Sequence, residues 1–90
     1  MNIIKEKNKV YIEENNITLA YVTFPNIDEN TVEIDHTVVD PSLRGQGIAS
    51  ILLENAYNVI KEEGFKAVPT CSYAVSWFNK HEDKQDILKK

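Results

Sequence analysis

The chain has 90 residues, of which 42% are hydrophobic and 27% are charged, and its formal net charge at pH 7 is −4. That length provides one modest hydrophobic core and leaves no room for a second domain, so residues 1–90 are expected to form a single domain. Charges of both signs are interspersed, which excludes a basic stripe for nucleic acid. No apolar run approaches the ~18 residues needed to cross a membrane, and the N-terminal residues carry no signal-peptide pattern. Because Cys71 is the single cysteine, no internal disulfide is possible and a reducing cytoplasm is the expected location.

Short antiparallel strands joined by tight turns are predicted for the first part of the chain. Runs rich in Val, Ile and Tyr occupy residues 3–6, 9–13 and 17–24. The segments between them, Lys7-Asn8 and Glu14-Asn15-Asn16, are typical of hairpin turns. Residues 25–30 are polar and are expected to form a loop.

One extended strand is predicted over residues 31–39, and Pro41 must end it because proline cannot donate to a strand ladder. Alternation along this strand puts four side chains on one face: Val32, Ile34, His36 and Val38. Glu33, Asp35 and Thr37 share the other face. His36 is thus the one polar side chain in an apolar row. It is either a core histidine bonded to a neighbouring strand or a group at a reaction centre.

An amphipathic helix is predicted over residues 48–63, because apolar side chains recur there at helical spacing: Ile48, Ile51, Leu52, Ala56, Val59 and Ile60. Gly64 suits the end of that helix, and residues 66–70 form a short strand after it. The order strand, helix, strand implies a right-handed parallel crossover. The fold class is therefore mixed α/β (α+β), with a mainly antiparallel sheet and one crossover.

A second short helix is predicted over residues 73–80, with Ser72 as its N-cap and with three side chains facing inward: Ala74, Trp77 and Phe78. The tail over residues 82–90 is mostly charged, and only Ile87 and Leu88 offer anything to bury. His81 is expected to be exposed.

The segment Arg-Gly-Gln-Gly-Ile-Ala at residues 44–49 lies between the predicted strand and the long helix. Gly45 and Gly47 allow backbone conformations that a Cβ would forbid, so several N–H groups at the helix start can face one ligand. The helix dipole and Arg44 add positive charge, which predicts a phosphate or pyrophosphate site. A P-loop is excluded because no lysine lies between Gly45 and Lys61, and a dinucleotide-binding turn is excluded because position 50 is Ser. The alternative is a structural glycine turn that caps a packed helix.

The pattern Arg44-x-x-Gly47-x-Ala49 resembles the acetyl-coenzyme A signature of the GNAT superfamily of N-acetyltransferases. His36-Thr37 and the segments 69–73 (Pro-Thr-Cys-Ser-Tyr) and 77–81 (Trp-Phe-Asn-Lys-His) also have counterparts in a small, single-domain GNAT-like subfamily. The resemblance covers about residues 3–88. It implies a minimal GNAT fold and an acyltransferase whose co-substrate is acetyl-coenzyme A.

The resemblance also implies how coenzyme A is held. The pantetheine arm lies between two strands that splay apart, near Val39 and Cys71, and it bonds the backbone of Val38 and Val39. The amides that meet the pyrophosphate, with Arg44 alongside, are those of Gly45, Gln46, Gly47, Ile48, Ala49 and Ser50. A typical GNAT domain has helices after its first strand that wall the acceptor site, whereas residues 3–24 here contain only strands. Because those helices are missing, we expect an acceptor site that is open or that another protein completes.

Acetyl transfer to an amine needs a group that removes a proton, because an amine of pKa ~10.4 is protonated near neutral pH. Three side chains are candidates for this general base: His36, Glu33 and Asp35. His36 has the best intrinsic pKa, ~6.5, whereas the two carboxylates also suit a solvated strand face. A backbone N–H at the splay can stabilise the oxyanion.

Cys71 is placed by the resemblance near the sulfur of coenzyme A, with Ser72 at the same helix start. It either packs as a small hydrophobe or accepts the acetyl group itself in a ping-pong route, helped by the helix dipole. Tyr73 either protonates the departing thiolate or packs. Two histidines and one cysteine, far apart in the sequence, predict no metal site.

Three classes of function remain open. The leading one is an N-acetyltransferase that moves an acetyl group from acetyl-coenzyme A to an amine, either on a small molecule or on a protein. The second is a non-catalytic module that binds or senses acetyl-coenzyme A. The third is a protein-interaction domain in which the glycine turn is only structural.

Overall fold

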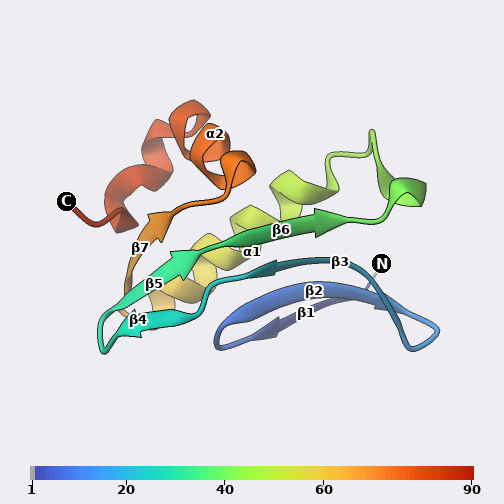
Figure 1. The fold of residues 1–90 in the computed structure, drawn as a ribbon, viewed down its shortest axis with the longest axis horizontal. Coiled ribbons are helices and arrows are strands. Elements are labelled where there is room, and N and C mark those ends of the chain that lie inside the picture. The colour runs from blue at the N-terminus through green and yellow to red at the C-terminus, as the bar shows by residue number, and fades with distance from the viewer. Residues whose placement is uncertain (1) are drawn as a thin grey trace.

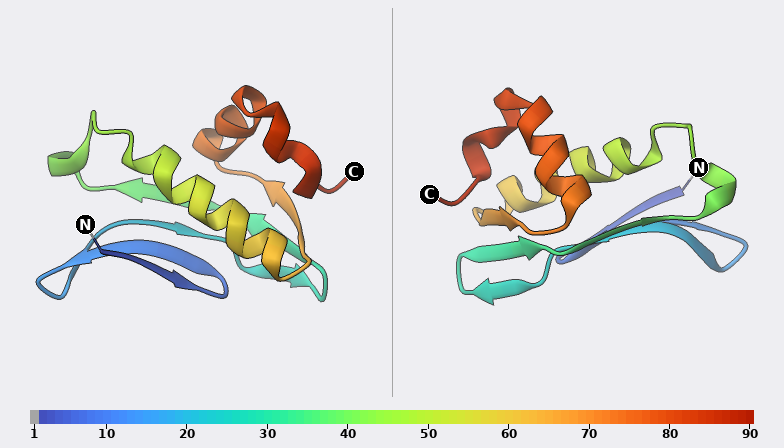
Figure 2. Two further views of the ribbon diagram at one scale, coloured as in Figure 1. Left: turned by 180° about the vertical axis from the view of Figure 1, so that it is seen from behind. Right: turned by 45° about the horizontal axis from the view of Figure 1, so that its top comes forward.

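The strands form a four-stranded and a three-stranded sheet that continue into one curved layer, and both helices lie on the same side of it (Figure 1, Figure 2). This computed structural model describes residues 2–90. Its elements, in chain order, are β1 (Asn2–Glu6), β2 (Lys9–Glu14), β3 (Ile17–Thr23), β4 (Asn26–Asp28), β5 (Thr31–Ile34), β6 (His36–Val39), the 3₁₀ turn η1 (Pro41–Leu43), α1 (Ile48–Glu62), β7 (Lys66–Pro69), α2 (Ser72–Lys80) and the 3₁₀ segment η2 (Glu82–Ile87). The mixed α+β fold predicted from the sequence is confirmed.

The first three strands form an antiparallel meander, as predicted. β1 pairs with β2 and β2 with β3. The β2–β3 connection is a two-residue hairpin turn in which Asn15 and Asn16 both have positive φ, 53° and 65°. Asparagine tolerates this left-handed conformation better than most residues, so the pair marks the turn in the sequence. The expected loop at residues 25–30 is wrong in part, because β4 lies within it and pairs with β5.

The predicted continuous strand over residues 31–39 is broken at Asp35. Its first half, β5, pairs with β4 and runs parallel to β7, whereas its second half, β6, pairs with β3. Asp35 N donates to Thr23 O, and His36 also stands opposite Thr23, so two residues face one, as in a β-bulge.

The bulge reverses the faces of the strand. Val32 and Ile34 are fully buried, but after the extra residue it is Thr37 and Val39 that face the helices and His36 that is exposed. The prediction of one apolar row containing His36 is therefore wrong. A single inserted residue moves every later side chain to the other face.

Helix α1 and the parallel pair β5–β7 form the predicted crossover. The helix ends in a Schellman motif: Gly64 has φ +75°, and Phe65 N donates back to Ile60 O at 3.1 Å. Ile51 is exposed rather than inward, and the sequence pattern missed Leu53 and Tyr57, which are buried. Within residues 2–90, no helix has the length and apolar character that a membrane span requires.

Helix α2 begins one residue earlier than predicted, and its N-cap is Cys71, not Ser72. The Cys71 sulfur accepts a hydrogen bond from Ala74 N. His81 is half-buried rather than exposed, because its ring stacks on Trp77 with 4.2 Å between centroids. In the tail, Ile87 is buried and Leu88 bridges to Ala67 beside β7.

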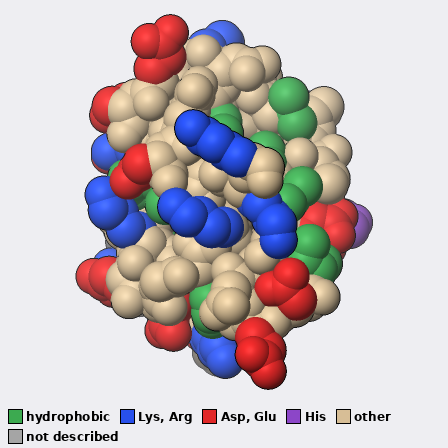
Figure 3. Space-filling view, turned by 90° about the vertical axis from the view of Figure 1, so that its left-hand side faces the viewer, with side chains coloured by type: hydrophobic (Ala, Val, Ile, Leu, Met, Phe, Trp, Pro, Cys, Tyr) green, Lys and Arg blue, Asp and Glu red, His purple; other side chains and the backbone are tan. Residues whose placement is uncertain are grey.

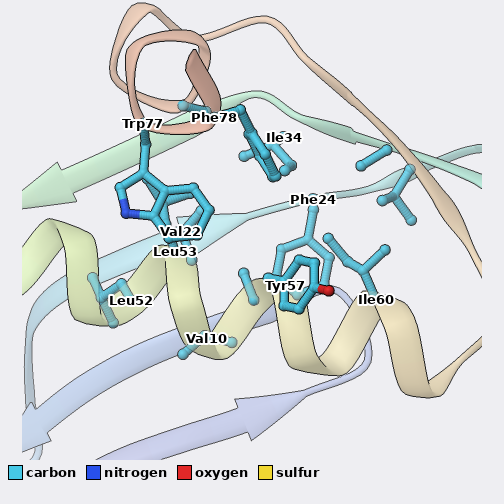
Figure 4. Packing of buried hydrophobic residues seen from close by; sticks show 14 of the residues in the cluster. Val10, Val22, Phe24, Ile34, Leu52, Leu53, Tyr57, Ile60, Trp77 and Phe78 are labelled. Carbon is cyan, nitrogen blue, oxygen red and sulfur yellow. The ribbon is translucent and has the colours of Figure 1, made fainter. Parts of the chain in front are cut away.

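The core lies between the sheet and the two helices (Figure 4). Its largest fully buried side chains include Phe24, Ile34, Leu52, Ile60 and Phe78. Within the described part of the chain, residues 2–90, the opposite face of the four-stranded sheet β1-β2-β3-β6 carries no helix (Figure 2). This asymmetry gives β6 one side that faces packed helices and one side that faces solvent.

Candidate functional site

The turn before α1 depends on two glycines in left-handed conformations. Gly45 has φ +83° and Gly47 has φ +70°, values that side chains other than glycine adopt at a cost. A Cβ at either position would meet nothing within 4 Å, so the requirement is for the backbone conformation and not for space. The turn starts at Asp40, whose carboxylate accepts hydrogen bonds from the amide and hydroxyl of Ser42. These bonds hold the pKa of Asp40 below its ordinary value.

The backbone amides of residues 45–50 take no part in the hydrogen bonds that hold the turn and the helix start together. The first intrahelical bond of α1 runs from Ile51 N to Gly47 O, and Gly47 provides no side-chain cap. Within residues 2–90, none of the six backbone N–H groups from Gly45 to Ser50 donates a hydrogen bond. Unpaired amides at a helix N-terminus, together with the helix dipole, form an anion site.

A cavity of about 300 Å³ extends from this turn to β6 and α2. It is lined by Thr37, Val39, Leu43, Arg44, Gly45, Gly47, Ile48, Ala49 and Tyr73. Seven of these were predicted from the sequence, and Thr37 and Leu43 were not. Thr37 could be placed only once the bulge at Asp35 is known, since the sequence pattern alone assigns it to the other face.

The predicted site residues outside this lining are His36, Val38, Gln46, Ser50, Cys71 and Ser72. The hydroxyl of Ser50 accepts from Trp77 Nε1 at 2.9 Å, which fastens α2 to the start of α1. Ser72 and Gln46 are exposed. Within residues 2–90, therefore, the fold brings the glycine turn, β6 and the first turn of α2 together around the cavity, whereas His36 lies on the other side of the sheet.

The edge of β6 that faces the cavity has free backbone groups. Asp40 N donates to Leu19 O on β3, and N–H directions alternate along an antiparallel strand. The N–H and C=O of Val38 therefore point toward β3, whereas those of Thr37 and Val39 point to the open edge. The predicted backbone role of Val38 is accordingly better suited to Thr37.

The two central strands separate where β5 becomes β6. The last backbone bonds from the β7 side run from Thr70 N and Cys71 N to Ile34 O. Beyond them the link is between side chains, with Thr37 Oγ1 3.4 Å from Cys71 Sγ. The half-buried Cys71 thiol thus lies beside a residue that lines the cavity, with Ala74 N 3.4 Å from its sulfur.

His36 lies on the uncovered face of the sheet, and its side chain is 66% exposed. The interpretation of His36 as a core histidine is therefore wrong. Its Nδ1 is 3.4 Å from Asp35 Oδ2, and Asp35 Oδ1 accepts from Thr23 Oγ1 at 2.6 Å. Glu33 is bound to Thr70 Oγ1 at 2.7 Å.

Comparison with known proteins identifies the family and the fold. Residues 9–87 match the family model of the GCN5-related N-acetyl-transferases, so the chain belongs to this family. Protein NATD1 of Xenopus tropicalis is 37% identical over 54 residues, a match that covers 60% of this chain and 50% of that protein. The chain thus matches about half the length of this relative.

Solved structures share the fold. A GCN5-like protein from Staphylococcus aureus aligns with a TM-score of 0.78 and 34% identity, over 98% of this chain and 87% of its own. Rv2747 from Mycobacterium tuberculosis, solved with coenzyme A, aligns with a TM-score of 0.66 and 15% identity, over 83% of this chain and 47% of its own. A GNAT family acetyltransferase from Elizabethkingia anophelis, solved with acetyl-coenzyme A, aligns with a TM-score of 0.62 and 21% identity, over 83% of this chain and 50% of its own.

Proposed function

We propose that the protein binds acetyl-coenzyme A in the cavity beside α1 and transfers its acetyl group to an amine. One observation carries this proposal: a row of unpartnered N–H groups at the glycine turn is joined by one cavity to the free edge of β6. The diphosphate of coenzyme A suits the N–H groups of the turn, and its amide-bearing pantetheine arm suits the free edge of β6. The family supports the same co-substrate.

In this proposal the diphosphate lies against the amides of residues 45–50, with Arg44 alongside. The arm bonds the free backbone groups of Thr37 and Val39. The thioester then reaches the end of β7, near Cys71, with Ser72 and Tyr73 at the adjacent helix start. Oriented backbone donors need no rearrangement when the ligand arrives, which favours tight binding.

The chemistry requires the loss of two protons from the acceptor nitrogen. His36 takes the first from the ammonium on the uncovered face, leaving a neutral amine that attacks the thioester carbon. The new C–N bond forms and the C–S bond breaks. The second proton is transferred to the departing thiolate, directly or through the Tyr73 hydroxyl. The products are an acetamide, coenzyme A as free thiol and one proton released to water.

Cys71 offers a second route to the same product. Its thiolate would attack the thioester, release coenzyme A and carry the acetyl group to the amine. The position of its sulfur beside Thr37 supports this route, and mass spectrometry of the protein after incubation with acetyl-coenzyme A alone tests it. A free thiol also suits the reducing cytoplasm, where we place the protein.

A non-catalytic acetyl-coenzyme A sensor is the second candidate. It is favoured by the uncovered sheet face, because His36 is two-thirds exposed and no wall for an acceptor stands beside it in residues 2–90. A protein-interaction domain, in which the turn is structural, would bind no coenzyme.

Two measurements separate these functions. Calorimetric titration with acetyl-coenzyme A should show binding, and failure to bind would leave only the interaction domain. Release of free thiol should then depend on an added amine, assayed with spermidine, a blocked lysine peptide and a peptide with a free N-terminus. Binding without amine-dependent release from this panel would favour the sensor.

A further inference from the structure

Three side chains meet at the β-bulge on the uncovered face. Because both Asp35 and His36 stand opposite Thr23, the two are held beside each other by the backbone. Thr23 Oγ1 donates to one oxygen of Asp35, and the other oxygen lies 3.4 Å from His36 Nδ1. Asp35 is mostly shielded, with 25% of its side chain exposed, whereas His36 is open to solvent.

A carboxylate oxygen 3.4 Å from a ring nitrogen favours the imidazole tautomer that carries the proton on that nitrogen. An unprotonated Nδ1 would direct its lone pair at a negative charge, which is repulsive, whereas Nδ1–H is attracted to it. His36 would then carry its proton on Nδ1. Its other nitrogen, Nε2, would have a free lone pair that points away from Asp35, toward solvent.

Resting on the proposed function, we propose that Asp35 is a positioning residue that keeps His36 in the form able to accept a proton. Thr23 takes part by fixing one carboxylate oxygen, so that the other is left for the histidine. In the reaction, the acceptor ammonium gives one proton to Nε2 and becomes a neutral amine. The resulting imidazolium has N–H on both nitrogens, lies beside the Asp35 carboxylate, and returns one proton to water afterwards.

The variant Asp35→Asn tests this arrangement because it changes one atom. Thr23 still donates to the amide oxygen, so the NH₂ group is directed at His36 Nδ1. That nitrogen must now accept a hydrogen bond, which moves the proton to Nε2 and removes the basic lone pair. The expected loss of turnover is about 10-fold, between the few-fold effect of exposed charge pairs and the ~10⁴-fold effect of a buried triad.

The decisive readout is the tautomer, measured by long-range ¹H–¹⁵N correlation spectra of the imidazole in the 90-residue chain. Wild type should carry the proton of neutral His36 on Nδ1, and Asp35→Asn should carry it on Nε2. Thr23→Val, which frees the carboxylate to rotate, should lower turnover by a smaller factor of about 2 to 3.

A matched control is Glu6→Gln. Glu6 stands in the same cross-strand row as Thr23 and His36, so the variant removes an equal charge from the same face without touching the histidine. It should leave the tautomer and turnover unchanged, and acetyl-coenzyme A affinity should be that of wild type in all three variants.

Failure of this inference is distinguishable from failure of the proposed function. A wild-type His36 protonated on Nε2, an unchanged tautomer in Asp35→Asn, or a changed tautomer with full turnover would each overturn the role of Asp35. An absence of coenzyme binding or of amine-dependent thiol release in wild type would instead contradict the proposed function.

Discussion

The two sides of β6 present opposite kinds of site. On the helix side, the candidate coenzyme site is made largely of backbone: glycines with positive φ, unpaired amides and a free strand edge. On the solvent side, the candidate acceptor site is made of side chains, with His36, Asp35 and Thr23 on an open sheet face. A backbone-built site depends on chain conformation and accepts one ligand shape. A side-chain site on an open surface can be changed without disturbing the fold.

The largest effect is expected from Gly47→Val. A β-branched residue at φ +70° is strained by about 1–2 kcal/mol or more, so the turn should rearrange and acetyl-coenzyme A binding should be abolished. Calorimetry measures the affinity, and circular dichroism the stability. The control is Gly64→Val, which places the same strain at φ +75° at the far end of α1. It should lose stability but keep its affinity in the folded fraction. Equal loss of affinity in both variants would contradict a local role for the turn.

His36→Gln tests the other side of the strand. Removing a general base should lower turnover by about 100-fold, near the lower limit of what such groups supply. Because the side chain is mostly exposed, the melting temperature and coenzyme affinity should not change. A variant that keeps full turnover would assign the base to another group, with Glu33 as the next to test.

Arg44→Ala should weaken acetyl-coenzyme A binding by about 1–3 kcal/mol, the range for a lost charge-assisted contact. Arg44 lines the cavity and is exposed, so the loss should shrink as salt is added. Arg44→Lys keeps the charge without the planar fork, so its affinity should lie between those of wild type and Arg44→Ala. Titrations at two salt concentrations measure the effect. An Arg44→Ala variant with wild-type affinity at low salt would show that the arginine does not contact the coenzyme.

Two substitutions and one labelling experiment distinguish a structural role of Cys71 from a chemical one. Cys71→Ser keeps an N-cap for α2, so it should melt close to wild type, whereas Cys71→Ala should lose up to about 1 kcal/mol of stability. Saturating coenzyme A should slow alkylation of the wild-type thiol. An alkylation rate that coenzyme A does not change, with the thiol accessible in the free protein, would place Cys71 outside the coenzyme site.

The smallest effect concerns acid stability near the turn. Hydrogen bonds from Ser42 hold the pKa of Asp40 in the folded state below its unfolded value. Its contribution to stability is therefore present above pH ~4 and is lost as the pH falls through the folded pKa. Asp40→Asn should melt slightly below wild type at neutral pH, and the difference should vanish in acid. A difference that persists at low pH would assign it to packing.

Local signals predicted most of the fold. The Asn15-Asn16 turn, the helical spacing in α1 and Gly64 at its end are short-range features, and the structure confirms each. The bulge at Asp35 could not be predicted, because it depends on two different strands, β3 and β7, pairing with the two halves of one segment. That one residue moved His36 to the solvent face and Thr37 into the cavity. The Cys71 cap was missed because serine is the stronger capping residue.

The claim that acetyl-coenzyme A lies along the glycine turn and the free edge of β6 is tested most directly by titrating ¹⁵N-labelled protein and following its amide signals. The account predicts that the largest shifts fall on residues 45–50 and on Thr37 and Val39, and that the amides of β1 and the β2–β3 turn do not respond. Saturable shifts confined to other surfaces, or unchanged amides at the turn, would contradict it.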